Sequence, residues 1–204
     1  MFASATPEHL AKVRALESKI ANRFKVMLEP EVFDASVHQG QAVAEAIYAW
    51  SMTDGGHEGY ARNVQEDYLV STGPGSWEST PPAFGKPLQP TWGNNRPFLL
   101  GEGECPVTPP LAYSEDPASA FYSQAKEVYQ TVSTLSDEER DIALFWADSP
   151  GETSTPPGHW IAIVTRLLSE GGYGLEFSSV TYAQLSITLA DAFIVCWREK
   201  YQYN

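Results

Sequence analysis

The sequence predicts an all-α helical bundle, and three observations favour this class. Apolar residues recur every three or four positions over several stretches, as they do along one face of an α-helix. No segment of the 204 residues alternates apolar and polar residues as half-buried strands do, and no internal repeat is visible. We expect a single helical domain over residues 1–204, with one long irregular loop at about residues 55–115.

Two helices are predicted before this loop. Thr6 offers an N-cap and Pro7 a favourable first helical residue, so the first helix runs to about Leu28. The second runs from about Asp34 to Met52 and ends at a glycine-rich turn. Both are expected to bury an apolar stripe, formed by Leu10, Val13, Leu16, Ile20 and Phe24 in the first and by Val37, Val43, Ala44, Ile47 and Trp50 in the second.

Two further helices are predicted directly after the loop. The turn at Asp116 caps a helix that runs to about Val132. Ser136 and Glu139 have the spacing of a capping box, which opens a short helix to about Ala147. The first of these helices is expected to carry four side chains inward: Ala120, Phe121, Val128 and Tyr129.

The last two predicted helices bring the chain to its C-terminal segment. One runs from about Pro157 to Glu170 and is closed by a glycine pair. The other is capped by Ser178 or Ser179 and reaches Lys200.

The long loop is rich in Gly, Pro, Ser and Trp and is much longer than an ordinary connection. Its aromatic residues are too many for a solvated linker, so we expect an ordered loop that they pin across the helices. These residues are Tyr60, Tyr68, Trp77, Phe84, Trp92 and Phe98. Alternatively, Trp77 or Trp92 shapes the entrance to a site, and the spacing does not decide between these functions.

Composition and charge exclude several classes of partner. The net charge is −13, because 26 acidic residues outnumber 13 scattered basic ones, which argues against nucleic-acid binding. The apolar segment 185–197 is interrupted by polar residues and is short for a membrane span, so none is expected. Residues 1–7 show no secretory signal, and the compartment and the oligomeric state stay open.

The cysteines and histidines do not predict a metal centre. Cys105 lies in the loop and Cys196 in the last helix, where it is expected to be buried, and we expect both to be free thiols. The four histidines show no helical pairing and no cluster at metal-ligand spacing. A zinc or iron site within the chain is therefore not expected.

The helix that ends at Lys200 is apolar on the side where this lysine lies. Since each helical residue advances by about 100°, that side also carries Leu189, Phe193, Cys196 and Trp197. A lone positive charge is costly to bury, so such a lysine reaches water, loses its proton or meets an anion. The plainer interpretation is a solvated lysine favoured by the helix dipole.

Residues 189–204 resemble the segment that opens the active site in vanadium-dependent haloperoxidases and their relatives in the type 2 phosphatidic acid phosphatase superfamily. Lys200 matches the family's first oxyanion ligand, and Trp197 matches the tryptophan that lines the pocket. Residues 142–151 with 155–160 are similar to the block that precedes the lysine helix in that family. The resemblance covers roughly residues 36–204 and implies a partial vanadium haloperoxidase-like fold.

The resemblance implies an oxyanion site built from lysine, arginine, serine and a backbone N–H, with a histidine at its apex. In such a site Lys200 binds vanadate or phosphate, and Asp148 is the carboxylate behind the pocket that orients the arginines. For Asp148 the alternative is a turn residue at a helix end. Asp191 faces away from Lys200, and we expect it to pair with Arg198.

The family pattern continues with Arg-Pro, Pro-Ser-Gly-His and Ser-Arg elements, and none of these follows Lys200 in the 204 residues. Arg96-Pro97 and Pro157-Gly158-His159 precede the lysine, so they do not supply the missing ligands. We therefore expect the N-terminal portion of a larger haloperoxidase-like enzyme, inactive alone because most vanadate ligands are absent.

The resemblance implies small-molecule partners for the complete protein, and relatives of this kind are often exported. With vanadate the partners are hydrogen peroxide and a halide, which is oxidised. The alternative is an acid phosphatase of the same superfamily, whose partner is a phosphate ester. A second alternative is a non-catalytic helical module.

Overall fold

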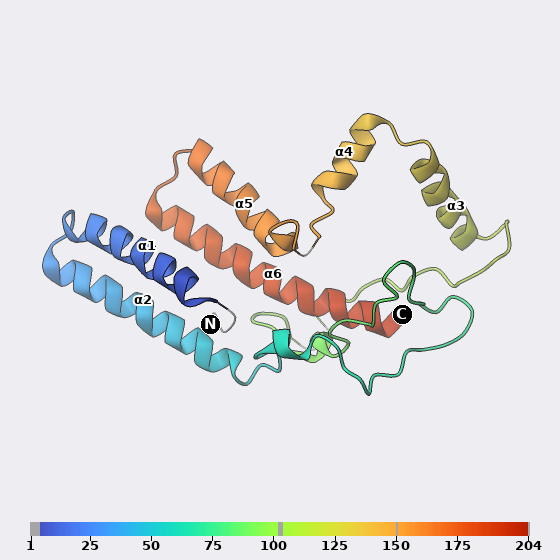
Figure 1. The fold of residues 1–204 in the computed structure, drawn as a ribbon, viewed down its shortest axis with the longest axis horizontal. Coiled ribbons are helices and arrows are strands. Elements are labelled where there is room, and N and C mark those ends of the chain that lie inside the picture. Colours follow the sequence, from blue (N-terminus) through green and yellow to red (C-terminus); the bar gives the residue numbers. More distant parts are fainter. Residues whose placement is uncertain (1–4, 102–103, 150, 204) are drawn as a thin grey trace. The chain divides into compact units, whose positions relative to one another are not determined.

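The computed structural model describes residues 5–101, 104–149 and 151–203. These residues form six α-helices and two short 3-10 helices (Figure 1), without a β-strand. One isolated bridge joins Val64 and Leu88 within the loop. The predicted all-α class is confirmed. Residues 1–4, Pro150 and Asn204, which entered the sequence predictions, lie outside the described residues.

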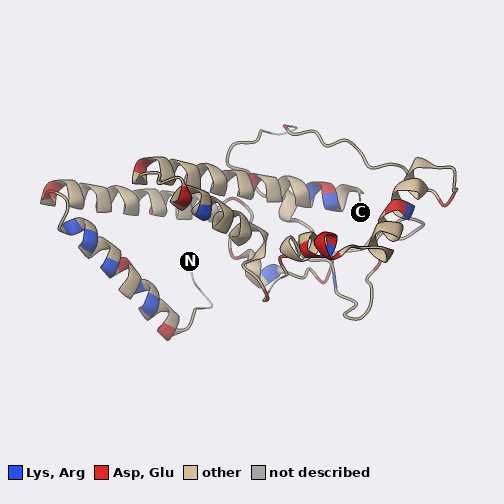
Figure 2. Cartoon of the chain, turned by 90° about the horizontal axis from the view of Figure 1, so that it is seen from above, with Lys and Arg blue, Asp and Glu red and all other residues tan. Residues whose placement is uncertain are grey.

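Contacts divide the chain into two units, one ending at Thr53 and the other beginning at Asp54. The first unit is a pair of helices, α1 (Pro7–Lys25) and α2 (Pro30–Ser51), which diverge from the turn that joins them (Figure 2). Thr6 caps α1 as predicted, since its hydroxyl accepts the His9 N–H at 3.3 Å. α2 begins before the predicted residue, because proline at a first helical position has no N–H to leave unpaired. The single domain stays a prediction.

Most of the apolar stripe of each helix is exposed, and Leu10, Phe24 and Trp50 are half-buried. No described residue of α1 or α2 is buried, and Leu16 and Ile47 are 57% and 49% exposed. The prediction that these stripes are buried is therefore wrong for the described chain. An apolar stripe is buried only where another element covers it, and within this unit each helix covers little of the other.

The second unit is organised around α6 (Leu175–Tyr203), a helix of 29 residues. α5 (Thr155–Glu170) packs beside it, and the 3-10 helix η2 (Trp92–Asn94) contacts it most extensively. The apolar core lies here, with Leu168 of α5 and Ile194 of α6. α6 begins before both predicted caps, and the Ser179 hydroxyl inside the helix donates to the Glu176 carbonyl at 2.9 Å.

The loop reaches α6 through a backbone contact at Gly93. A Cβ atom built on Gly93 would lie 2.4 Å from the Cα of Arg198, so only glycine fits between η2 and α6. On its other side this segment packs against η1 (Gly59–Arg62), where a Cβ on Gly59 would lie 2.6 Å from the Trp92 ring. The loop is thus held against the helix by its backbone as well as by the expected aromatic residues.

The remaining helices of this unit are α3 (Ala120–Ser133) and α4 (Asp137–Phe145). Ser136 and Glu139 form the predicted capping box at the start of α4. α3 is capped by Ser119 rather than by Asp116, whose carboxylate instead accepts the Ala118 N–H at 2.9 Å in the preceding turn.

The predicted inward face of α3 is not buried. Val128 and Tyr129 are 64% and 74% exposed, so the prediction for these residues is wrong. No element of the described chain packs across this face of α3.

By length and composition, α6 is the one helix among the described residues that could cross a membrane. With 29 residues, α6 is longer than the segment 185–197, from which no membrane span was expected. Core helices of soluble proteins meet the same criteria of length and composition. No charged residue lies between Glu176 and Asp191, and several lie near the C-terminal end (Figure 2). Asp191 is 5% exposed because the loop covers it.

Candidate functional site

The C-terminal end of α6 places Trp197, Lys200 and Tyr201 beside the long loop. Residues three and four positions apart lie on one helical face, so Trp197 neighbours both of the others. The Lys200 Nζ lies 5.0 Å from the centre of the Trp197 ring and 5.9 Å from that of Tyr201. An ammonium at these distances is attracted to the ring faces. Lys200 is thus held over aromatic rings while it stays exposed to solvent.

Two hydrogen bonds attach the loop to this end of α6. The Trp197 indole N–H donates to the Leu88 carbonyl at 3.1 Å, and the Tyr201 hydroxyl donates to the same oxygen at 2.7 Å. The Tyr68 ring meets the Tyr201 ring edge-on, with centroids 5.5 Å apart. Partial burial raises the pKa of Tyr201 above its usual value, so the phenol stays protonated at neutral pH.

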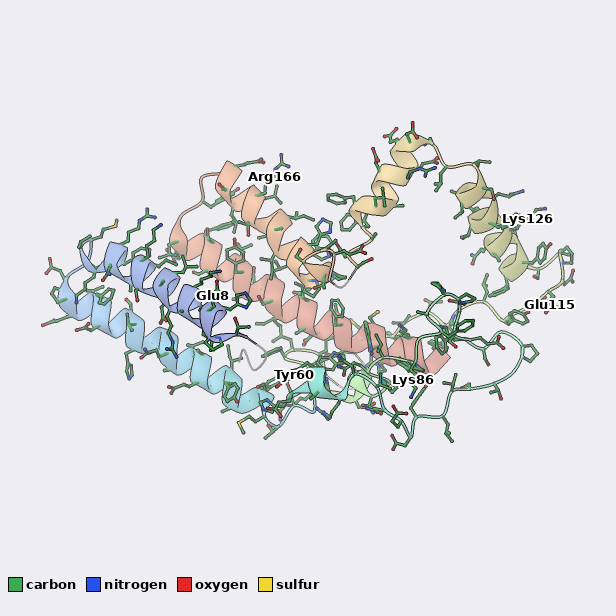
Figure 3. All side chains as sticks on the ribbon, in the orientation of Figure 1. Glu8, Tyr60, Lys86, Glu115, Lys126 and Arg166 are labelled. Carbon is green, nitrogen blue, oxygen red and sulfur yellow. The ribbon has the colours of Figure 1, made fainter. Side chains whose placement is uncertain are left out.

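A pocket of about 580 Å³ lies between the loop and the end of α6. Its lining includes four aromatic residues and two lysines, Tyr68, Trp77, Trp197, Tyr201, Lys86 and Lys200. Figure 3 shows Lys86 beside the C-terminal end of α6. The Lys86 ammonium lies 2.6 Å from a Glu66 carboxylate oxygen, and both side chains are largely exposed. Lys200 and Trp197, the two residues singled out in the sequence, thus line one pocket together with residues of the loop.

The residues of this pocket do not form a complete vanadate site. A tetrahedral oxyanion with several negative charges is held by several cations and N–H or O–H donors. Among the described residues that line the pocket, the cations are Lys86 and Lys200, and neither arginine nor histidine is present. Lys86 is already paired with Glu66. The groups present therefore do not fit vanadate by themselves.

Asp148 lies in the connection between α4 and α5 and contacts His159 of α5. The His159 Nδ1 lies 2.9 Å from both carboxylate oxygens, and the two side chains are only 13% and 9% exposed for His159 and Asp148. The rings of Phe145 and Trp146 flank the imidazole, with centroids 4.5 and 5.0 Å from it. A carboxylate on Nδ1 fixes the orientation of the imidazole. Asp148 is not among the residues that line the Lys200 pocket.

Sequence reasoning did not predict the pairing of Asp148 with His159. The sequence predicts Asp148 either as a carboxylate that orients arginines or as a turn residue at a helix end, and it gives His159 no ligand or partner. The signal lay in the two aromatic clusters at 145–146 and 159–160, because a turn between them brings their rings together.

Asp191 binds the loop backbone and does not pair with Arg198, so that prediction is wrong. Its carboxylate accepts the N–H groups of Phe98, Leu99 and Leu100 at 2.6, 2.9 and 3.3 Å. The Arg198 guanidinium instead lies 3.2 Å from a Glu199 oxygen. Three N–H donors satisfy a buried carboxylate better than an exposed cation does, because they solvate both oxygens at fixed positions.

The other predicted residues fall in separate places. Trp77 lines the pocket, whereas Trp92 packs against Gly59 of η1 and against Gly56, which precedes η1. Cys105 and Cys196 are both free, as predicted, and Cys196 is exposed rather than buried. In the part of the chain that the structure describes, no group of three or more His, Cys, Asp or Glu is placed to hold a metal ion.

Comparison with solved structures relates this arrangement to a known enzyme fold. A bacterial vanadium-dependent iodoperoxidase shares 31% sequence identity with the chain and superimposes with a TM-score of 0.73. The fold is haloperoxidase-like. The match covers 94% of this chain and 46% of that chain, so this chain spans about half the length of the iodoperoxidase. No family model and no curated protein matches the sequence.

The haloperoxidase-like fold confirms the resemblance drawn from residues 142–160 and 189–204 at the level of fold. Those two segments contain the end of α4, the first part of α5 and the C-terminal half of α6, and α5 and α6 form the core of the second unit.

Proposed function

We propose that the chain forms the lysine-bearing part of a vanadate-dependent haloperoxidase-like enzyme, which oxidises a halide with hydrogen peroxide when complete. The observation that supports this most strongly is the likeness to the iodoperoxidase, because 31% identity accompanies the fold over 94% of the chain. A fold alone does not specify function, so the proposal also depends on the lysine pocket.

In this function Lys200 contributes one charge-assisted contact to an oxyanion. Its ammonium is accessible, and the Trp197 ring lies beneath it at 5.0 Å. Since Trp197 is itself hydrogen-bonded to the loop, the ring that attracts the ammonium is held in place before a ligand arrives. Trp197 is the proposed pocket-lining residue.

Asp148 is proposed as a carboxylate that lies behind the oxyanion pocket and orients the arginines that bind the anion. In the described chain its partner is His159. An arginine of the complete protein would share this carboxylate, whose two oxygens have several acceptor positions.

The 204 residues alone are proposed to be inactive. They span 46% of the length of the iodoperoxidase, and the lining of the pocket supplies two cations, one of them already paired. Large apolar side chains on α1 to α5 are exposed, as expected for helices whose covering elements belong to a larger domain.

The proposal is tested with the complete protein, vanadate, hydrogen peroxide and iodide or bromide, with halogenation of a phenol as the readout. We expect halogenation that requires both vanadate and peroxide. Hydrolysis of a chromogenic phosphate ester without peroxide, inhibited by vanadate, would instead show the acid phosphatase. If the complete protein showed neither halogenation nor phosphate ester hydrolysis, the non-catalytic helical module would be the remaining alternative.

A further inference from the structure

The Lys200 pocket has a second property, which its oxyanion chemistry does not explain: aromatic side chains from two segments contribute to its lining. Tyr68 and Trp77 of the loop and Trp197 and Tyr201 of α6 all line the pocket, and the Tyr68 and Tyr201 rings are in edge-on contact. A volume of about 580 Å³ lies in the range of pockets that bind small molecules.

The rings from α6 are fixed in orientation. The Trp197 N–H and the Tyr201 hydroxyl are both used in hydrogen bonds to the Leu88 carbonyl, so their polar atoms point to the loop. The edge-on contact with Tyr68 fixes the Tyr201 ring further. Such preorganised walls lower the conformational entropy lost when a flat ligand binds.

The charge in the pocket is positive at the helix end. Among the described residues, no carboxylate lies within ion-pair distance of Lys200, whereas Lys86 pairs with Glu66 and Arg198 with Glu199. The Lys200 ammonium is exposed to solvent, so an anion can reach it, and the contact with an exposed carboxylate adds a modest amount to the affinity.

We propose that this pocket binds a small planar aromatic anion, with its ring against the tryptophan and tyrosine side chains and its carboxylate or phenolate on the Lys200 ammonium. The aromatic side chains supply ring contacts, and the Lys200 ammonium, which pairs with no described carboxylate, discriminates an anion from a neutral or cationic ligand of the same shape. This site requires only the described residues, so it does not depend on vanadate binding.

The test uses the 204-residue chain and three probes of one shape, 2-naphthoate, 2-naphthamide and 2-naphthylmethylammonium, measured by calorimetry or ligand-observed NMR. For a ligand of this size we expect naphthoate to bind with a Kd on the order of 1 mM or below. Naphthamide is expected to bind about fivefold more weakly, and the cation more weakly still. Equal binding of all three probes would overturn the proposal.

Two pairs of variants locate the site. Lys200→Gln is expected to weaken naphthoate about fivefold and to leave naphthamide unchanged, whereas Lys126→Gln on α3 changes neither. Trp77→Ala is expected to weaken both ligands about threefold to tenfold, whereas Trp160→Ala on α5 does not. Equal losses in Lys200→Gln and Lys126→Gln would show non-specific attraction and overturn the proposal. If the complete protein failed to bind vanadate, the proposed function would be wrong, but the 204-residue chain would still be expected to bind naphthoate.

Discussion

At the scale of single residues, Asp191 holds the loop to α6 with one buried carboxylate. Asp191→Ala removes three hydrogen bonds to backbone N–H groups. Because the cost of burying the carboxylate also disappears, we expect a net loss of about 2–3 kcal/mol in the free energy of unfolding. Asp191→Asn should also destabilise, since its amide NH₂ would face N–H donors. Urea unfolding followed by tryptophan fluorescence measures both, and unchanged midpoints would contradict the anchoring role.

Gly93 gives a prediction of steric origin. Its replacement by alanine places a methyl group 2.4 Å from the Arg198 Cα and 2.5 Å from its N, both backbone atoms of α6 that cannot move aside. We expect Gly93→Ala to destabilise the second unit by at least about 2 kcal/mol. Gly40→Ala in α2 is the control, because nothing lies within 4 Å of the added atom. Its stability should be unchanged or slightly higher. Equal effects of the two variants would show that η2 moves freely on α6.

Lys200 gives a prediction about the complete protein. Removing one charge-assisted contact costs about 1.5–3 kcal/mol, so Lys200→Ala should weaken vanadate affinity by at least about tenfold. Lys126→Ala is the control, because it removes an equal charge from the exposed surface of α3. A vanadate titration unchanged in Lys200→Ala would remove this lysine from the oxyanion site.

The residues that sequence reasoning located are those whose neighbours follow from helical spacing. Lys200 and Trp197 are three positions apart on one helix, so their proximity could be predicted. The partners of Asp191 could not, because backbone N–H groups occur at almost every residue and have no sequence signature. The Asp148–His159 contact depends on a turn geometry that composition does not specify.

At the scale of elements, the helices could be predicted better than their ends. The capping box of α4 was located because two side chains and two backbone groups bond reciprocally at a fixed spacing. The start of α6 was missed because helix formation continued through Ser178 and Ser179, whose hydroxyls can bond inside a helix as well as at its end.

The capping box of α4 gives a pH prediction. The Glu139 carboxylate accepts the Ser136 backbone N–H and, second, its hydroxyl, and these bonds lower the pKa of Glu139 below its usual value. A lowered pKa in the folded state means that this stabilisation is present above the ordinary carboxyl pKa. It is lost as pH falls through the lowered value. NMR titration should show a low midpoint for Glu139, and Ser136→Ala should raise it part of the way, because the backbone N–H remains. An ordinary midpoint in the unsubstituted chain would contradict the capping box.

At the scale of the whole molecule, the fold class could be predicted from the sequence, but which apolar helix faces are buried could not. The all-α class follows from the apolar periodicity, which also predicted buried stripes on α1, α2 and α3. No described residue of these stripes is buried, since periodicity identifies the face that a helix can bury but not the element that covers it.

The last prediction concerns the 204 residues as an isolated polypeptide. They should neither halogenate a phenol in the presence of vanadate, peroxide and bromide nor bind vanadate tightly. The reason is electrostatic, because the pocket offers the Lys200 ammonium and a Lys86 already paired with Glu66, too few cations for a multiply charged oxyanion. Vanadate titration by ⁵¹V NMR and a bromination assay measure the two properties, with the complete protein as the positive control. Bromination by the isolated chain would show that its own residues complete the site.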